Sequence, residues 1–573
     1  MSLVEVTDLT VEFGALRAVD GLSFRLAEGA ALGLVGESGS GKSTVASALL
    51  GLHRGTGAAV GGSVRVAGTD VQSASDEELR RLRGGRAAMV FQDPLSSLDP
   101  YYAIGDQIAE VYRVHTRVSR RTARARAVQV LERVGIPDPV RRSRSRPHEF
   151  SGGMRQRALI AMALACEPDL LIADEPTTAL DVTVQAQILD LLHTLREETG
   201  MGLLLVTHDV GVAAESVDEV LVMRHGRLVE HGPVGAVLAA PAQPYTRELL
   251  GAVPRVEARR AVGHGPEEPD VRRPDVRRSH VRRPDAGGPQ ADVRPAADRP
   301  SAEVVLEAHG LRREFGRGKR AFAAVDGVSL TVHRGETLGV VGESGSGKTT
   351  LGRMLVGLLE PTAGEVRYEG RVSTGVNPTV QMVFQDPVSS LNPRRSVGES
   401  IADPLRAPGA PGAWGVRGRG EARVRERVTE LLERVGLEAA HYDRYPHEFS
   451  GGQRQRVGIA RALAAGPRVI VCDEPVSALD VTTQAQVVAL LGELQRELGL
   501  ALVFVAHDLA VVRQVSDRVA VMRRGRVVEE GPADEVYESP RDPYTRQLLA
   551  AVPALDPAIA ARRRTERREP ALA

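Results

Sequence analysis

A glycine-rich loop that carries one lysine occurs twice in this chain. It reads GESGSGKST from Gly36 to Thr44 and GESGSGKTT from Gly342 to Thr350. A loop of the form GxxxxGK[ST] places backbone N–H groups around phosphate oxygens, and the helix that starts at its end adds the positive end of its dipole. Two such phosphate loops predict that the protein binds a nucleoside triphosphate.

The lysine and the hydroxyl residue of each phosphate loop have separate expected roles. Lys42 and Lys348 are expected to reach the β- and γ-phosphates, and Ser43 and Thr349 to bind Mg²⁺. The chain has only three lysines, and two of them lie in these loops, which indicates a need for a compact ammonium group there. The loop residues expected to contact the nucleotide are Gly36, Ser38, Gly39, Ser40, Gly41, Lys42, Ser43 and Thr44, with Gly342, Ser344, Gly345, Ser346, Gly347, Lys348, Thr349 and Thr350.

Two adjacent carboxylates follow an apolar segment in each half of the chain. These segments are LLIADE, which ends at Glu175, and VIVCDE, which ends at Glu474. Asp174 and Asp473 suit a contact to Mg²⁺ through water. Neighbouring strand residues point to opposite sides, so the glutamates can address a different point, the attacking water. Either pair alone could be an ordinary strand end, but its position after a phosphate loop favours hydrolysis.

A histidine ends the next apolar segment in each half. His208 closes LLLVTH, and His507 closes LVFVAH. A single histidine in such a place is more often a structural residue held by hydrogen bonds. Because both histidines recur at the same distance from the glutamates, we favour a sensor that contacts the γ-phosphate and positions water.

The segments SGGMRQR and SGGQRQR, which begin at Ser151 and Ser450, form a second cluster of N–H donors at a helix start. A half that already holds its phosphates does not need a second cradle. Each SGG segment is therefore predicted to complete the site of the other half. This places the two halves head to tail around two nucleotides.

The repeats divide the chain into two homologous domains, predicted at 1–253 and 303–556. The offset between them is 306 residues at the loop lysines and 299 from the SGG segments onward. Residues 254–302 contain eight prolines and no aromatic residue. Such a segment cannot bury enough apolar surface to offset the entropy lost on ordering, so a disordered linker is predicted. Residues 557–573 are predicted to be a frayed tail, with contact to anionic lipid as the alternative.

Short apolar runs bounded by turn residues predict buried parallel strands, and amphipathic segments between them predict helices. This alternation indicates an α/β fold. Arginine-rich helical patterns between Gln92 and Ser151, and between Gln385 and Ser450, predict a helical subdomain inserted in each half. The turn-rich segment 407–420 is predicted to be a loop insertion.

The bulk composition excludes several classes of protein. The formal net charge is zero, which argues against a nucleic-acid partner. No apolar run is long enough to span a bilayer, and no signal peptide is expected at the N-terminus. Cys166 and Cys472 stand far apart without a CxxC pattern, as expected of small core residues in a reducing compartment.

The order of these motifs, repeated twice, resembles the nucleotide-binding domains of ABC (ATP-binding cassette) proteins, which are tandem P-loop NTPase domains here. The resemblance implies ATP and Mg²⁺ as cofactors. It implies one site that uses Phe13 against adenine, Lys42, Ser43, Gln92, Asp174, Glu175 and His208, completed by Ser450, Gly451, Gly452 and Gln453. It implies a second site that uses Phe315, Lys348, Thr349, Gln385, Asp473, Glu474 and His507, completed by Ser151, Gly152, Gly153 and Met154.

Some details of these sites depend on the resemblance alone. Gln92 and Gln385 are implied as further Mg²⁺ contacts. Phe322 competes with Phe315 for the adenine position across a short insertion. Met154 replaces the commoner Gln. Because both glutamates and both histidines are present, two hydrolytic sites are expected.

The segments FQDPxSSLxP and PHEFSGG, and the PYTR segments at Pro244 and Pro543, are similar to the dipeptide, oligopeptide and nickel importer ATPases. That resemblance implies ATP-driven closure of the two halves. It also implies two permease partners contacted through the helical subdomains, an extracytoplasmic substrate-binding protein, and a peripheral position on the cytoplasmic face of the bacterial membrane. No cysteine follows Tyr245 in its extension or Tyr544, so no iron–sulfur cluster is expected.

The cargo is expected to be di- or oligopeptide, with nickel, glutathione-like compounds and peptide antibiotics left open. The alternative class is a soluble tandem-cassette translation factor that acts on the ribosome. Such factors are expected to carry a long charged helical linker. The proline-rich linker and the two PYTR segments favour the importer.

Overall fold

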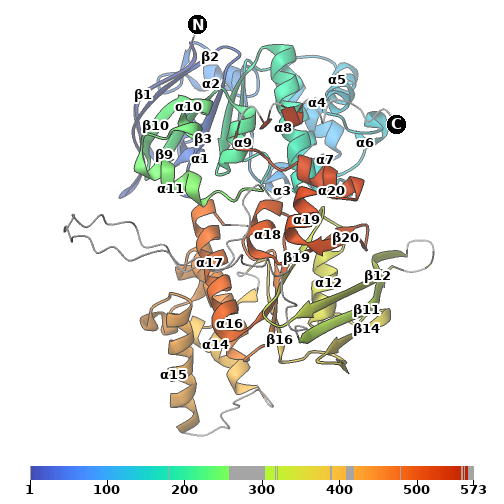
Figure 1. Cartoon of the computed structure of the whole chain (residues 1–573). Helices are drawn as coiled ribbons and strands as arrows, with labels where there is room; N and C mark the ends of the chain where they lie inside the picture. Colours follow the sequence, from blue (N-terminus) through green and yellow to red (C-terminus); the bar gives the residue numbers. More distant parts are fainter. Residues whose placement is uncertain are drawn as a thin grey trace, which may run out of the picture.

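The computed structural model describes residues 2–178, 180–256, 303–316, 318, 321–386, 390–407, 419–477, 479–556, 559–560 and 562–564. Most of the predicted linker, and residues 408–418 of the predicted loop insertion, therefore lie outside the described residues. The two halves have the same succession of elements (Figure 1).

Each half contains a mostly parallel sheet of six strands and an antiparallel sheet of four strands. The strands of the first half are β1 (Ser2–Phe13), β2 (Leu16–Ala27), β3 (Ala31–Val35), β4 (Ala59–Val66), β5 (Thr69–Asp70), β6 (Ala87–Val90), β7 (Leu170–Asp174), β8 (Gly202–Thr207), β9 (Glu219–Arg224) and β10 (Arg227–Pro233). Those of the second half are β11 (Val304–Phe315), β12 (Phe322–His333), β13 (Thr337–Val341), β14 (Ala363–Tyr368), β15 (Arg371–Val372), β16 (Val380–Val383), β17 (Val469–Asp473), β18 (Ala501–Val505), β19 (Arg518–Arg523) and β20 (Arg526–Pro532).

The helices surround these sheets. In the first half they are α1 (Lys42–Leu49), α2 (Asp76–Leu82), α3 (Pro94–Ser97), α4 (Ile104–Thr116), α5 (Arg120–Arg133), α6 (Pro139–Arg142), α7 (Gly152–Ala163), α8 (Val182–Thr199), α9 (Val210–Ser216), α10 (Val234–Ala239) and α11 (Pro244–Ala252). In the second half they are α12 (Lys348–Leu355), α14 (Val397–Arg406), α15 (Arg419–Arg434), α16 (Gly451–Ala464), α17 (Val481–Leu498), α18 (Leu509–Val515), α19 (Ala533–Glu538) and α20 (Pro543–Ala550).

The six-stranded sheets confirm the predicted α/β fold. Their orders are β10-β9-β3-β8-β7-β6 and β16-β17-β18-β13-β19-β20, and every pairing is parallel except that of the edge strand β10 or β20. Every residue of β3, β7 and β8 is buried, as apolar runs covered on both faces should be. The phosphate loops and the acidic pairs lie at the carboxyl ends of these strands, which is where such sheets bind ligands.

The antiparallel sheets, ordered β2-β1-β4-β5 and β12-β11-β14-β15, were not predicted from the sequence. Their strands alternate between buried and exposed residues, because one face packs on α1 or α12 and the other faces solvent. Register shifts break the alternation in β1 and β11. Because of these bulges, the alternation of buried and exposed residues that marks a strand cannot be recognised from the sequence alone.

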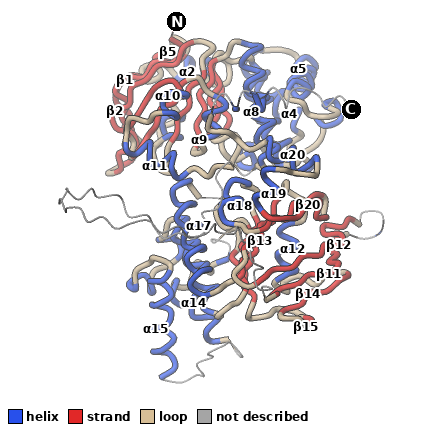
Figure 2. The backbone as a smooth tube through the Cα atoms, in the orientation of Figure 1, coloured by secondary structure: helices blue, strands red, loops and turns tan. Residues whose placement is uncertain are grey.

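In Figures 1 and 2 the strands and the helical insertion lie on opposite sides in the two halves. The strands of the first half lie opposite the helical insertion of the second half, and the reverse holds on the other side (Figure 2). The insertions are built from α4 to α7 and from α14 to α16 and share the core clusters of their own halves. The head-to-tail arrangement predicted from the SGG segments also requires each of them to meet the opposite phosphate loop, and that contact stays a prediction. None of the helices among the described residues is long and apolar enough to cross a membrane.

The chain segments that follow α11 and α20 contact the opposite half, and together we call their described residues the crossing segments (253–256, 553–556, 559–560 and 562–564). Val256 packs on the core of the second half, and its carbonyl accepts a hydrogen bond from Arg513 of α18. Ala554 N–H donates to Glu215 Oε1 of α9 at 3.1 Å, and Leu555 packs on the core of the first half. The sequence analysis had assigned residues 254–256 to the linker, but the structure seats them on the second half.

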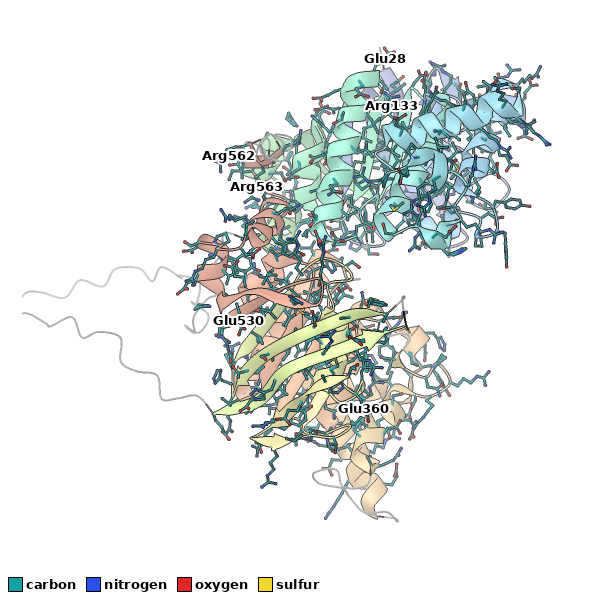
Figure 3. All side chains as sticks on the ribbon, turned by 90° about the vertical axis from the view of Figure 1, so that its right-hand side faces the viewer. Glu28, Arg133, Glu360, Glu530, Arg562 and Arg563 are labelled. Atoms are coloured by element: carbon teal, nitrogen blue, oxygen red, sulfur yellow. The ribbon has the colours of Figure 1, made fainter. Side chains whose placement is uncertain are left out.

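The last described residues also lie against the first half. Arg564 donates to the carbonyl of Glu215 and lies 3.0 Å from His193 Nε2. Figure 3 places Arg562 and Arg563 beside the first half. The sequence analysis had treated this segment as part of a frayed tail. Arg564 contacts Glu215 of α9 and His193 of α8, whereas Arg563 donates to Val552 O at 2.8 Å. Residues 565–573 lie outside the described residues, so the frayed tail stays a prediction.

Candidate active site

Each phosphate loop connects a buried central strand to a helix that begins at the lysine. Gly41 has φ 99°, and a side chain there would meet Ala18 O at 2.4 Å, so this position requires glycine. Lys42 is 4% exposed, and its Nζ donates to Gly36 O and Glu37 O, both at 2.8 Å. In this structure the lysine is therefore bonded to the carbonyls of its own loop.

The second loop repeats this geometry. Lys348 is 5% exposed and donates to Gly342 O at 2.7 Å and Glu343 O at 2.9 Å. Burial lowers the pKa of both lysines, and nearby carboxylates, led by Glu175 and Glu474 respectively, oppose that shift. A buried ammonium group at the start of a helix is suited to an anionic ligand.

The hydroxyl and carboxylate predicted to hold Mg²⁺ lie together in both halves. Ser43 Oγ donates to Asp174 Oδ1 at 3.0 Å, and Thr349 Oγ1 donates to Asp473 Oδ1 at 3.0 Å. Burial raises the pKa of each aspartate, and the hydroxyl hydrogen bond opposes that shift. Paired oxygen donors next to a phosphate loop are the ligands that Mg²⁺ prefers, so the residues present fit this ion.

The glutamate after each strand has unusual backbone geometry. Glu175 and Glu474 both have φ 47°, in the left-handed region that non-glycine residues rarely adopt. The main chain is fixed by hydrogen bonds from Glu175 N to Val206 O and from Glu474 N to Val505 O, each 2.9 Å. Strain that the surroundings maintain in this way is typical of functional sites.

Three side chains hold the carboxylate of Glu175. Gln92 Nε2 donates to Oε2 at 2.8 Å, Thr178 Oγ1 donates to Oε2 at 2.9 Å, and His208 Nδ1 lies 3.1 Å from Oε1. Burial raises the pKa of Glu175, but the hydrogen bond and charge of His208 outweigh it, and the net pKa is lowered. Burial lowers the pKa of His208, but Glu175 outweighs it, and the net pKa is raised.

Glu474 is held in a similar way, with one difference. Gln385 Nε2 donates to its Oε2 at 2.8 Å, and His507 Nδ1 lies 3.3 Å from the same atom. Ser477 replaces Thr178 and donates instead to the backbone carbonyl of Glu474, at 3.2 Å. The two glutamines, predicted as Mg²⁺ contacts, are thus found on the glutamates.

A cavity of about 620 Å³ lies over Lys348 and Thr349. Phe315 and Phe322 both line it, with ring centroids 5.9 Å apart, so both aromatic candidates remain in place for adenine. In the first half Phe13 is 39% exposed and packs edge-on against His53. Contact of Phe13, and of Phe315 or Phe322, with adenine stays a prediction.

The other half contributes to this cavity through residues that the sequence analysis did not select. Thr178, Leu180 and Asp181 of the first half line it, whereas Ser151, Gly152 and Gly153 do not. The negative charge of Asp181 raises the pKa of Lys348, and that of Asp480 raises the pKa of Lys42, both against the larger effect of burial. The repeated ALDVT segments carry both aspartates, and this repetition is the signal that could have identified them.

The SGG segments cap their own helices. Ser151 Oγ accepts a hydrogen bond from Met154 N, and Ser450 Oγ accepts one from Gln453 N, both at 3.3 Å. Gln453 Oε1 also accepts from Ser450 N at 3.0 Å. Contact between these segments and the opposite phosphate loop therefore stays a prediction, because Leu180 and Asp181 line the cavity over Lys348 from the first half.

A strand-to-helix phosphate loop, an acidic pair and a histidine, set in an α/β sheet with a helical insertion and repeated head to tail, define a tandem pair of ATP-binding cassettes. The model of the ABC transporter family matches residues 19–178 and 325–477. The model of the oligopeptide/dipeptide transporter C-terminal region matches 229–276 and 528–573. The chain belongs to the ABC transporter family, binds ATP, and is an ATPase that couples hydrolysis to transport.

Curated relatives match almost the whole chain. The glutathione import ATP-binding protein GsiA of Salmonella choleraesuis (strain SC-B67) is 46% identical over 94% of this chain and 87% of its own. GsiA of Escherichia coli O157:H7 is 45% identical over 95% and 87%. GsiA of Pectobacterium atrosepticum is 45% identical over 97% and 90%. The alternative of a ribosome-bound factor is not favoured by these relatives.

Proposed function

We propose that this chain energises an importer of short peptides, with glutathione, itself a tripeptide, among the candidate cargoes. The observation that carries the proposal is the set of six side chains repeated in both halves: the lysine of the loop, the hydroxyl bonded to the aspartate, and the glutamate held between glutamine and histidine. The C-terminal regions of the oligopeptide/dipeptide type and the relatives named for glutathione import support the cargo class.

Hydrolysis is assigned to both halves. Lys42 and Lys348 would exchange their loop carbonyls for the β- and γ-phosphates. Glu175 and Glu474, ionised at neutral pH because their pKa values are lowered, would orient and deprotonate the attacking water. His208 and His507 would hold these carboxylates and contact the γ-phosphate.

Mg²⁺ would be held by Ser43 and Asp174 in one site and by Thr349 and Asp473 in the other. When bound it would neutralise charge that develops on the phosphate oxygens. Gln92 and Gln385 would contact both this ion and the glutamates. Their N–H₂ groups donate to the carboxylates, and their amide oxygens can bind the ion.

Closure of the two halves on ATP would bring the SGG segments onto the opposite phosphate loops. The helical insertions would then move with Gln92 and Gln385 and push on membrane-embedded permeases. A peripheral position on the cytoplasmic face of the cell membrane, with a substrate-binding protein on the far side, follows from this role.

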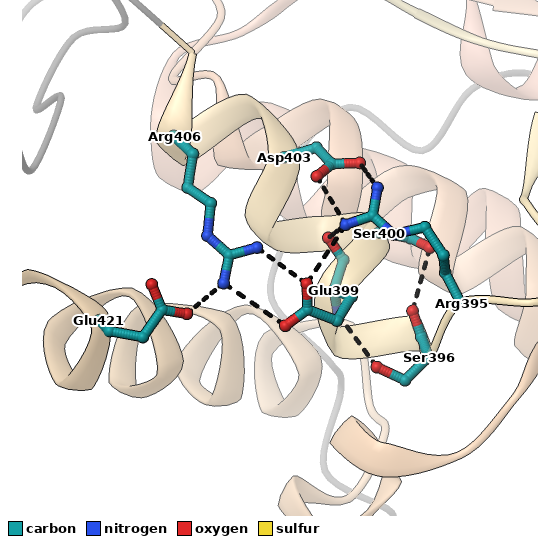
Figure 4. A network of polar contacts seen from close by, with 7 residues as sticks. All are labelled: Arg395, Ser396, Glu399, Ser400, Asp403, Arg406 and Glu421. Carbon is teal, nitrogen blue, oxygen red and sulfur yellow. Dashed lines mark hydrogen bonds and ion pairs between the residues drawn. The ribbon is translucent and has the colours of Figure 1, made fainter. Parts of the chain in front are cut away.

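Two different permease subunits are proposed, because the two insertions present different surfaces. In the first, Tyr101 and Tyr102 are 80% and 61% exposed. In the second, Arg395 replaces the second tyrosine and pairs with Asp403 at 2.6 Å and Glu399 at 3.2 Å (Figure 4). Arg406 extends this network from Glu399 to Glu421 of α15.

The test uses the double variant Glu175→Gln, Glu474→Gln in the full chain. It should bind ATP as the parent does while steady-state hydrolysis is abolished, and the exposed Glu360→Gln should change neither. Tagged double variant, purified from solubilised membranes with ATP, should retain two different permeases, identified by mass spectrometry. Near-normal turnover would overturn the catalytic assignment, and ribosomal proteins in place of permeases would overturn the importer role.

A further inference from the structure

A tyrosine of the C-terminal extension lies directly beneath the second phosphate loop. Tyr544, in the first turn of α20, is 2% exposed, and its hydroxyl accepts a hydrogen bond from the backbone N–H of Glu343 at 3.1 Å. The guanidinium of Arg523 lies 4.6 Å from the ring centroid. Asp542 Oδ1 accepts from Tyr544 N at 2.7 Å and fixes the start of the helix. Tyr544 is thus fixed by Asp542 at its backbone N–H, by Arg523 on its ring face and by Glu343 at its hydroxyl.

Glu343 is the second residue of the loop, and both of its backbone polar groups are used. Its N–H is held by Tyr544, and its carbonyl accepts from Lys348 Nζ at 2.9 Å. When Lys348 turns to a phosphate, that carbonyl loses the lysine and keeps the hydrogen bond from Ser346 N at 3.2 Å. The hydrogen bond to Tyr544 then remains to keep this residue, and the start of the loop, in place.

The first half has a tyrosine at the same position, but its hydrogen bonds differ from those of Tyr544. Tyr245 is 6% exposed, and Arg224 lies 4.5 Å from its ring centroid. Its hydroxyl makes no hydrogen bond of ordinary geometry, although the backbone N–H of Glu37 is near enough to lower its pKa against the effect of burial. The carboxylate Oε1 of Glu37 instead accepts from Thr482 Oγ1 of the other half at 2.8 Å.

We propose that Tyr544 is a positioning residue for the second ATP site, through which the C-terminal extension sets the affinity of the phosphate loop for nucleotide. The extension continues from α20 into the crossing segment, so the same helix contacts its own phosphate loop and leads to the opposite half. This inference rests on the nucleotide sites proposed above. It concerns affinity alone, because Tyr544 touches neither the phosphates nor the attacking water.

The test compares Tyr544→Phe with Tyr537→Phe in the full chain. Tyr537 lies in α19 of the same extension and donates from a buried hydroxyl to Leu509 O at 2.6 Å, away from the phosphate loop. Both changes remove one buried hydrogen bond, so both should lower the melting temperature. Only Tyr544→Phe should raise the KM for ATP, by about three- to tenfold, with kcat within about twofold of the parent.

Equilibrium binding of a fluorescent ATP analogue to a Lys42→Ala background isolates the Lys348 site and should give the same rise in Kd. Tyr245→Phe should have a smaller effect on KM, since its hydroxyl bond is weaker. The proposal is overturned if Tyr544→Phe leaves KM and Kd unchanged, or if Tyr537→Phe shifts them equally. Failure of the parent chain to bind the analogue would instead refute the nucleotide sites themselves.

Discussion

Gln92 Nε2 donates a hydrogen bond to Glu175 Oε2 over 2.8 Å, and this bond joins the helical insertion to the proposed catalytic glutamate. Gln385 and Glu474 repeat it at the same distance. Because the insertion begins just after the glutamine, its movement against a permease would change the position of the carboxylate. The bond would thus connect the proposed permease-contacting surface to the proposed hydrolytic step.

Gln92→Ala combined with Gln385→Ala should lower kcat by about ten- to a hundredfold, because a hydrogen bond to a charged group is worth about 1.5–3 kcal/mol. Steady-state hydrolysis by the purified chain measures this. Gln107→Ala is the control, since Gln107 lies in the same insertion and bonds Asp99 and Tyr102 but neither glutamate. An unchanged kcat in the double variant would contradict the connection.

The His208–Glu175 pair should make stability depend on pH. The folded-state pKa of His208 is raised above its usual 6.5, so the pair contributes stability fully below that pH and loses it as pH rises through the folded pKa. The difference in melting temperature between the parent and His208→Gln should therefore be largest near about pH 6 and shrink toward about pH 9. The exposed His148→Gln should give no such trend, and a difference that grows with pH would refute the sign.

Arg513 should hold the halves together. It is 4% exposed, pairs with Glu538 at 2.9 Å and donates to the Val256 carbonyl of the opposite half's segment. Arg513→Ala should lower the free energy of unfolding by about 1–3 kcal/mol in urea titrations. With a protease site placed in the linker, the cleaved parent halves should co-elute in gel filtration without nucleotide.

The same cleavage experiment tests the other crossing segment. Arg513→Ala combined with Glu215→Ala removes, on each half, the side chain that bonds the crossing segment of the other half. The cleaved halves of this variant should separate. Arg227→Ala, which removes an exposed ion pair with Asp20 within the first half, is the control and should leave them together. Separation of the cleaved parent would mean that these contacts do not hold the halves.

Cys472 should be inert in the native chain. It is fully buried in β17, and burial raises the pKa of its thiol to about 12, so almost no thiolate exists at neutral pH. Burial also raises the pKa of Cys166. Mass spectrometry after iodoacetamide treatment should find Cys472 unmodified in native protein and fully modified in denaturant. Rapid native labelling would show that β17 opens readily.

The repeated motifs were enough to predict the parallel sheets and the pairing of Ser43 with Asp174, because these depend on local spacing and on strands that end at one edge. The antiparallel sheets were missed because bulges interrupt their alternation. The contacts of Asp181 and of Thr482 with the opposite half could not be predicted either. These contacts depend on how the two domains pack against each other. The spacing of motifs within one domain carries no information about that packing.

The crossing segments also impose an order on synthesis. Ala554 and Arg564 bond to Glu215 of α9, a helix completed more than three hundred residues earlier. The first half must therefore stay soluble with that surface open while the second half is made, a condition under which exposed apolar patches invite aggregation or chaperone binding. Truncation before Ala554 would keep every motif proposed for hydrolysis and would remove the contacts of Ala554 and Arg564 with Glu215 of α9.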